Sequence, residues 1–200
     1  GRNSGRGESV ILVTQRLGVH ETYQELRQQL SLEWNEFFSN FSSAVFVPVL
    51  YGSNIEYLFD TFNVAGVLFT GGNDVATTKR SFSEVKNTSS PTVLGDSWVK
   101  ASENVPLALS QMRDNFEEQL FSAAVEHGAA ILGVCRGCQF LAARFGATLR
   151  PCVGHVATHH TVKFSKNAAP YNEFKEWSEC YPSMKVNSYH SIGIENSNRM

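Results

Sequence analysis

Short runs of branched apolar residues recur along the chain, and helical spacing follows most of them. The runs at 9–14, 44–50, 65–70 and 129–134 have the length and composition of buried strands. Pro48 indicates a sheet edge or a strand end, because proline cannot donate a hydrogen bond to a neighbouring strand. Strands that alternate with helices predict an α/β fold with an open, mainly parallel sheet and helices on both faces.

Apolar residues three and four positions apart predict the helices that connect these strands. The first stripe consists of Tyr23, Leu26, Leu30, Trp34 and Phe37. Asn54 is placed to cap a second helix, whose apolar face is Ile55, Leu58, Phe59 and Phe62. A third helix over 113–128 shares a face of Phe116, Leu120, Phe121, Ala124 and Val125, and Gly128 can end it. A fourth helix is predicted over 136–146, and the polar stretch 73–111 reads as a long surface excursion.

Composition and charge narrow the class of protein. Two hundred residues with 42% hydrophobic and 18% charged side chains suffice for one domain, expected over 9–200, with 1–8 as a linker or an expression remnant. A net charge of −2 gives no case for nucleic acid or an anionic membrane as partner. No apolar run has the length of a membrane span or of a signal peptide, and four clustered cysteines are too few for a disulfide scaffold. These features predict a cytoplasmic protein.

The segment "GVCRG" at 133–137 follows the fourth predicted strand and begins the fourth predicted helix. Glycines on both sides of Cys135 fit a sharp strand–turn–helix bend with a nucleophile at its apex. The dipole and free amides of a helix N-terminus favour the thiolate form of a cysteine, which is the reactive form. The pattern therefore favours a nucleophilic Cys135.

Three other interpretations of this cysteine exist. A cysteine after an apolar strand is often a small buried hydrophobe. "CRGC" matches C-x-x-C, but redox pairs of this spacing need a thioredoxin-like setting, and we expect Cys138 to point into packing. Zinc would need a second C-x-x-C pair. Cys152 is the one further candidate ligand near H-x-x-x-H-H at 155–160, so no metal site is predicted.

The segment "TGGND" at 70–74 ends the third predicted strand. Ligands in open α/β sheets collect beyond the carboxyl ends of the strands, so this segment and Cys135 are expected near one site. Two consecutive glycines can direct backbone amides at the oxyanion that forms during acyl transfer. Alone, the segment would be an ordinary glycine-rich turn; next to the cysteine bend, the functional reading is favoured.

Together, "GVCRGCQ" and "LFTGGND" resemble the class I glutamine amidotransferase-like superfamily, whose nucleophile motif reads G-[VI]-C-x-G-x-Q. "FTGGNDV", "RD..E..L", "HHTV" and "VNSYH" are similar to its γ-glutamyl hydrolase branch, which includes γ-glutamyl-γ-aminobutyrate hydrolases. "VTQR" and "GHVATHH" look closer to a bacterial subgroup that includes hydrolases of γ-glutamyl-CDP-amidate. The resemblance implies a flavodoxin-like three-layer sandwich, and it covers the chain from residue 9 onward.

The resemblance also implies roles for individual residues. Cys135 would attack the γ-carbonyl of a γ-glutamyl amide and form a glutamyl thioester. The backbone amides of Gly72 and Arg136 would form the oxyanion hole, which Gly71 would shape. The residues implied for binding the glutamyl group are Gln139, Asn187, Ser188, Tyr189, His190 and His160. The small γ-glutamyl substrate would need no cofactor, and a homodimer or an upstream fused domain is possible.

One expected motif does not occur in these 200 residues. The superfamily takes its general base from a later H-P-E motif, so we expect the chain to be C-terminally incomplete. His190 is a candidate replacement base, but its "NSYH" setting matches the substrate-binding strand. Two further functions stay open at this point: a glutaminase domain that delivers ammonia to a synthetase partner, and a non-catalytic binding relic.

Overall fold

The computed structural model describes residues 8–41, 43–76, 105–163 and 183–195. The chain forms two compact units, Gly1–Thr148 (unit 1) and Leu149–Met200 (unit 2). Each unit has its own strands and is described by itself. The expectation of one domain over 9–200 stays a prediction. No helix among the described residues has the length and apolar character needed to cross a membrane.

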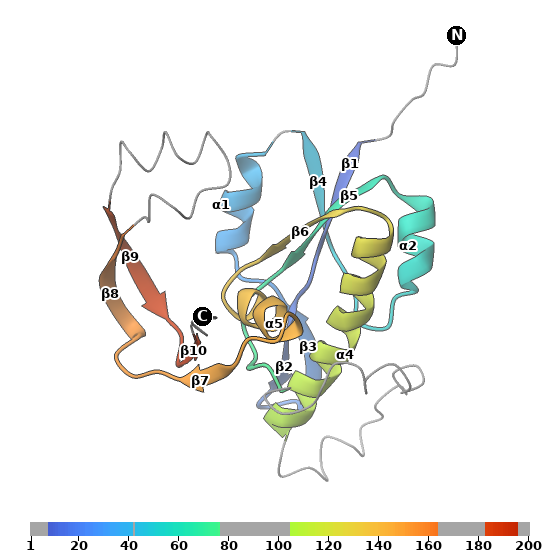
Figure 1. Ribbon diagram of the computed structural model, residues 1–200. Helices are drawn as coiled ribbons and strands as arrows, with labels where there is room; N and C mark the ends of the chain where they lie inside the picture. Colours follow the sequence, from blue (N-terminus) through green and yellow to red (C-terminus); the bar gives the residue numbers. More distant parts are fainter. Residues whose placement is uncertain (1–7, 42, 77–104, 164–182, 196–200) are drawn as a thin grey trace. The chain divides into compact units, whose positions relative to one another are not determined.

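Unit 1 is built on a four-stranded parallel sheet (Figure 1). Its strands are β1 (Ser9–Val13), β4 (Ala44–Pro48), β5 (Val64–Phe69) and β6 (Ala130–Gly133). They lie in the order β4-β1-β5-β6, and each neighbouring pair is parallel. Pro48 is the last residue of the edge strand β4, where its missing N–H costs no hydrogen bond within the sheet. The predicted parallel sheet is confirmed.

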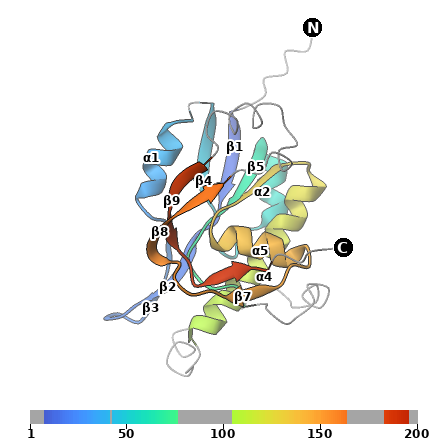
Figure 2. The ribbon, with the colours of Figure 1, turned by 60° about the vertical axis from the view of Figure 1, so that its left-hand side comes forward.

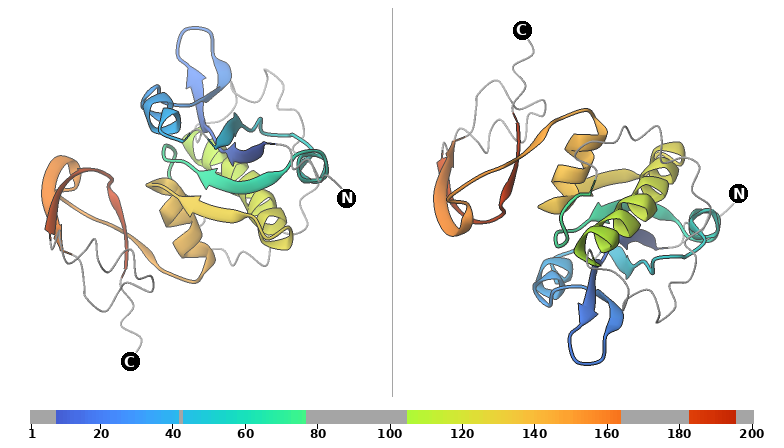
Figure 3. Two further views of the ribbon diagram at one scale, coloured as in Figure 1. Left: turned by 90° about the horizontal axis from the view of Figure 1, so that it is seen from above. Right: turned by 90° about the horizontal axis from the view of Figure 1, so that it is seen from below.

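Helices cover both faces of this sheet (Figures 1 and 3). They are α1 (Glu33–Ser39), α2 (Ile55–Thr61), α4 (Val105–Glu126) and α5 (Arg136–Arg144). Helix α1 packs on one face, where the Phe38 ring stacks on Phe46 of β4 at 4.1 Å, and α2, α4 and α5 lie on the other. Asn54 caps α2 as predicted, because its side chain accepts a hydrogen bond of 3.0 Å from the Tyr57 N–H.

The predicted first helix is wrong over most of its length. Residues 16–29 form an antiparallel hairpin of β2 (Arg16–His20) and β3 (Glu25–Gln29), and only α1 is helical. Val19 faces Leu26 across the hairpin. Leu26, which the prediction placed on the apolar stripe of a helix, is therefore part of a cross-strand pair. Tyr23 lies in the connecting turn and is 72% exposed. The apparent helical spacing arose because a hairpin and a short helix follow each other.

Helix α4 begins earlier than predicted, but it ends just before Gly128 as predicted, and Gly128 has a φ of 68°. It begins at Val105, so the last part of the excursion predicted over 73–111 is helical, while 77–104 lies outside the described residues. Val125 is 58% exposed, although it was placed on the apolar face with four residues that are buried: Phe116, Leu120, Phe121 and Ala124. Val125 lies five positions after Leu120, which at 3.6 residues per turn places the two side chains on different sides of the helix.

Unit 2 consists of two antiparallel strand pairs (Figure 2). Strand β7 (Leu149–Pro151) pairs with β10 (Ile192–Ile194), and the longer β8 (Val156–Lys163) pairs with β9 (Ser183–Tyr189). The register of the second pair sets His159 opposite Asn187 and His160 opposite Val186. It therefore brings the "HHTV" and "VNSYH" segments together as adjacent strands.

Candidate functional site

Cys135 lies at a sharp bend between β6 and α5. Its backbone has φ 56° and ψ −113°, a positive φ that residues other than glycine rarely adopt. Cys135 is the N-cap of α5, and its carbonyl accepts the first helical hydrogen bond from the Gln139 N–H at 3.1 Å. The thiol is exposed and free of any disulfide. Strained backbone that places an exposed nucleophile at a helix N-terminus is the geometry of a nucleophile elbow.

The loop after β5 reaches the same place. A Cβ atom added to Gly71 would lie 3.2 Å from Cβ and 3.5 Å from Sγ of Cys135, so the two strand ends meet as the sequence indicated. Gly72 has φ +121°, which only glycine adopts without strain. Among the described residues, the backbone N–H groups of Gly72 and Arg136 donate to no protein acceptor. Both amides are therefore available to bind an anion.

We expect Gly71→Ala to lower kcat/KM about 10²-fold, because the new methyl group would contact Cys135 and displace the reacting atoms. The backbone of Gly71 does not need a positive φ, so the melting temperature should change little. Steady-state kinetics and a thermal melt of the same preparation check both parts. A variant with wild-type turnover would show that the Gly71 position is remote from the reacting atoms.

The glycine loop is held by hydrogen bonds to neighbouring strands. The side chain of Asn73 accepts from the Leu17 N–H at 2.9 Å and donates to the Leu17 carbonyl at 2.8 Å, so it extends the pairing of β2. Thr70 donates from its hydroxyl to the Thr14 carbonyl at 2.8 Å, and the Thr14 hydroxyl accepts from the Thr70 N–H at 3.1 Å. The path of the loop is thus fixed before any ligand binds.

Four charged side chains are buried beneath the loop and the bend. Arg113, Asp114 and Glu117 come from α4 and Arg136 from α5, and each is at most 5% exposed. Burial disfavours the charged form of the Arg136 guanidinium and lowers its pKa. The carboxylates of Glu117 and Asp114 outweigh this effect and raise the pKa above its usual value. Burial, reinforced by Glu117, also raises the pKa of the neighbouring phenol of Tyr51.

Sequence reasoning gave these four residues no side-chain role. The "RD..E..L" motif served only as a mark of the family, and only the backbone of Arg136 was assigned a function. A signal was present, because Arg113 and Glu117 interrupt the stripe that Phe116, Leu120 and Ala124 place against the sheet. Charges within a buried stripe indicate a paired internal network.

Two other residues of α5 were singled out in the sequence. Gln139 is 9% exposed and lies one turn beyond Cys135. Cys138 is exposed, so the expectation that it points into packing is wrong. A residue in the first turn of a helix faces outward unless the helix is covered on that side. Cys135 and Cys138 are both free thiols, and exposure alone does not distinguish them.

The residues expected to bind the glutamyl group, other than Gln139, lie in unit 2. Ser188 of β9 is buried, and its hydroxyl donates to the His155 carbonyl at 2.8 Å, whereas Asn187 and Tyr189 are exposed. His190 follows β9, and its Nδ1 lies 2.9 Å from the Ile192 carbonyl oxygen. A carbonyl oxygen only accepts, so Nδ1 of His190 is the donor in this contact.

His155 joins this group in unit 2. Its ring lies 4.9 Å from the ring of His190 and 5.1 Å from the ring of His160, measured between centroids, and its Nδ1 is 3.2 Å from the Ser188 hydroxyl. Sγ of Cys152 lies 3.5 Å from Nδ1 of His190. No three histidine, cysteine or acidic side chains in the described parts of the chain are arranged to hold a metal ion. Ring contacts and hydrogen bonds hold these side chains together.

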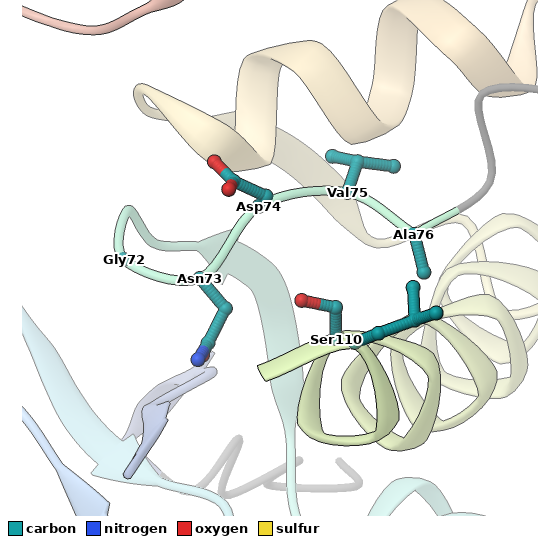
Figure 4. Close-up of a pocket in the computed structure, with 7 residues that line it drawn as sticks. Gly72, Asn73, Asp74, Val75, Ala76 and Ser110 are labelled. Carbon is teal, nitrogen blue, oxygen red and sulfur yellow. The ribbon is translucent and has the colours of Figure 1, made fainter. Parts of the chain in front are cut away.

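A cavity of about 470 Å³ borders the glycine loop (Figure 4). It lies between the loop and the first turns of α4, and its lining consists of Gly72, Asn73, Asp74, Val75, Ala76, Leu107 and Ser110. Figure 4 shows the side chains of Asn73 and Asp74 pointing to opposite sides of the loop. Because Gly72 is part of its wall, the cavity begins next to one of the candidate oxyanion donors.

A family model described as peptidase C26 matches residues 10–199, which is nearly the whole chain. The chain belongs to the peptidase C26 family. This family is of the class I glutamine amidotransferase-like, γ-glutamyl hydrolase type, so the resemblance seen in the sequence is confirmed. The chain is accordingly a hydrolase of the C26 type.

Two individual proteins illustrate the relationship. The γ-glutamyl-CDP-amidate hydrolase of Campylobacter jejuni subsp. jejuni serotype O:2 is 30% identical over 168 residues, which are 84% of this chain and 70% of that protein. A glutamine amidotransferase from Thermotoga maritima superposes with a TM-score of 0.52 at 17% identity over 96% of this chain. This chain spans 65% of that structure, and the likeness confirms the predicted fold.

Proposed function

We propose that this protein hydrolyses a γ-glutamyl amide through a thioester on Cys135. The observation that carries the proposal is the strained backbone of Cys135, with its exposed thiol against Gly71 at the meeting point of two strand ends. Membership of the peptidase C26 family supports a small γ-glutamyl substrate. The proposal assigns each half of the reaction to particular groups of the chain.

In the first half, the Cys135 thiolate attacks the γ-carbonyl carbon of the substrate, and the carbonyl oxygen becomes an oxyanion. The Gly72 and Arg136 N–H groups donate hydrogen bonds to it, and removal of one such donor typically costs about 10²–10³ in rate. Collapse of the intermediate breaks the C–N bond, and the leaving nitrogen takes a proton from the general acid. Water then attacks the thioester, which releases glutamate and restores the thiol.

The proton transfers need a base that first deprotonates the thiol and then the attacking water. In the superfamily this role belongs to the histidine of the H-P-E motif, which does not occur within residues 1–200. Activity experiments on this proposal therefore use the full-length gene product. The proposed oxyanion donors and nucleophile all belong to unit 1.

The glutamyl group carries an α-amino and an α-carboxylate group, and both need polar partners. We assign these contacts to Gln139 of α5 and to five residues of unit 2: His160, Asn187, Ser188, Tyr189 and His190. Support comes from the pairing of β8 with β9, which gathers His160, Asn187, Ser188 and Tyr189 in one two-stranded element, and His190 directly follows β9.

The leaving group is proposed by analogy with the relative from Campylobacter jejuni, whose name gives γ-glutamyl-CDP-amidate as its substrate. We propose a substrate of this kind, in which the γ-glutamyl group is attached to the amidate of a nucleoside diphosphate. The cavity beside Gly72 supports a leaving group larger than ammonia, since its volume of about 470 Å³ exceeds that of a single small amine.

Glutamate release from a panel of γ-glutamyl amides tests the proposal. We expect the full-length protein to release glutamate from γ-glutamyl-CDP-amidate or a related amide, and to do so faster than from glutamine. Release from glutamine alone would favour a glutaminase, and release from none of the amides would reject the proposed activity.

A labelling experiment tests the nucleophile independently of the substrate. Cys135 should react with iodoacetamide before the other cysteines, because it caps a helix N-terminus where a thiolate is stabilised. Cys138 is the matched control, since its thiol is also exposed and lies in the same helix. Peptide mass spectrometry over a time course gives both rates. Equal rates at Cys135 and Cys138 would contradict the assignment.

A further inference from the structure

Arg113 contacts the glycine loop through its guanidinium group. Its Nη2 donates to the Thr70 carbonyl at 2.7 Å, and its Nη1 donates to the Gly71 carbonyl at 2.8 Å. These carbonyls belong to consecutive residues just before Gly72, whose N–H is a candidate oxyanion donor. The side chain of Arg113 is fully buried, so no water competes for these hydrogen bonds.

The same guanidinium is connected to the nucleophile bend. Nε of Arg113 donates to Oε1 of Glu117 at 2.8 Å, and the other oxygen of Glu117 accepts from Arg136. Arg136 follows Cys135 directly and supplies the second candidate oxyanion amide. A single carboxylate therefore connects the arginine beneath the loop to the arginine beside the nucleophile.

Asp114 closes the network on its other side. One of its oxygens accepts from Arg136, and the other accepts from the Ala76 N–H at 2.8 Å. The loop 70–76 is consequently held at its start by Arg113 and at its end by Asp114, and both residues lie on one turn of α4. Two positive and two negative charges balance, so the buried cluster is neutral overall.

We propose that Arg113 is a positioning residue: acting with Glu117, it fixes the spacing between the two oxyanion donors, the N–H of Gly72 and the N–H of Arg136. The expected effect on turnover rests on the proposed function. The expected effect on the position of the loop rests on the contacts above alone. A buried ion pair is weak evidence of a contribution to stability, because its desolvation cost can exceed its Coulombic gain. We therefore explain the burial of the Arg113 guanidinium by its hydrogen bonds to the two loop carbonyls, and not by a gain in the stability of the fold.

Arginine is needed at this position because its donors have fixed directions. The planar guanidinium reaches two carbonyls and one carboxylate at once, in three directions. A lysine would keep the charge opposite Glu117 but would offer a shorter reach and no planar fork. Arg113→Lys should therefore preserve the charge balance and loosen the loop.

Kinetics of full-length Arg113→Lys form the first part of the test. We expect kcat to fall about 10²-fold with little change in KM, because the donors are misplaced for the transition state while the ground state still binds. Arg144→Lys is the matched control, since Arg144 of α5 pairs with Glu118 of α4 at 3.0 Å in the same helix interface. It should keep wild-type kcat. An equal loss of kcat in both variants, or a rise of KM alone in Arg113→Lys, would overturn the proposal.

Hydrogen exchange tests the structural part without any substrate. In Arg113→Lys, backbone amides of 70–76 and 134–139 should exchange faster, and both segments should change together, whereas α2 should keep its protection. Glu117→Gln, which keeps the size of the side chain, should show the same pattern and serves if Arg113→Lys fails to fold. Unchanged exchange in both segments would overturn the proposal. If the wild type releases no glutamate, the proposed function fails, and the exchange data alone decide whether Arg113 positions the loop.

Discussion

Cys135→Ala should abolish hydrolysis of γ-glutamyl amides by the full-length protein. Loss of a covalent nucleophile typically costs about 10⁴–10⁶ in kcat, which far exceeds any effect expected from packing. The exposed thiol makes little contribution to the core, so the variant should unfold at the wild-type denaturant concentration. Glutamate release and urea unfolding of the same preparation measure the two properties separately.

Cys138→Ala provides the control for this prediction. It removes a second exposed thiol from the same helix and should leave turnover unchanged. If the two cysteines worked as a redox pair, both variants would lose activity to a similar extent, and activity would respond to dithiothreitol. Turnover by Cys135→Ala close to that of the wild type would reject the thioester mechanism altogether.

Much of unit 1 was predictable because its signals are local. The central strands β1 and β5 are largely buried and therefore read as continuous apolar runs. The cap at Asn54 and the bend at Cys135 depend on residues within one turn of the backbone. The meeting of Gly71 with Cys135 followed from a general property of parallel sheets, whose carboxyl ends lie at one edge.

What the sequence did not predict depends on contacts between distant segments. The hairpin of β2 and β3 is defined by cross-strand pairs such as Val19 with Leu26, and a one-dimensional spacing cannot separate these from a helical stripe. The Arg113 network joins residues of α4 to Thr70 and Arg136, which lie 43 and 23 positions away along the chain. Such charges are recognisable as buried, but their partners are not.

Gly137 lies against the backbone of β5, and Gly137→Ala should destabilise unit 1 strongly. An added Cβ would lie 2.0 Å from the carbonyl oxygen of Phe69 and 2.6 Å from its carbonyl carbon, and both atoms belong to the backbone of β5. Glycine to alanine within a helix should by itself be favourable by about 1 kcal/mol. We expect a net loss of about 3 kcal/mol or more, because α5 can relieve the clash only by moving away from the sheet.

Gly18→Ala in β2 is a suitable comparison. Its new methyl group would meet only the end of the Gln29 side chain, at 3.5 Å, so this variant should unfold close to the wild-type midpoint. Because α5 begins directly after Cys135, a displaced α5 would also move the thiol and the Arg136 amide away from Gly72. Gly137→Ala should therefore lose turnover even at temperatures where it remains folded. Wild-type stability and turnover in Gly137→Ala would contradict this prediction. It would show that there is room for a methyl group between α5 and the Phe69 carbonyl oxygen, which lies 2.0 Å from the position of the added Cβ.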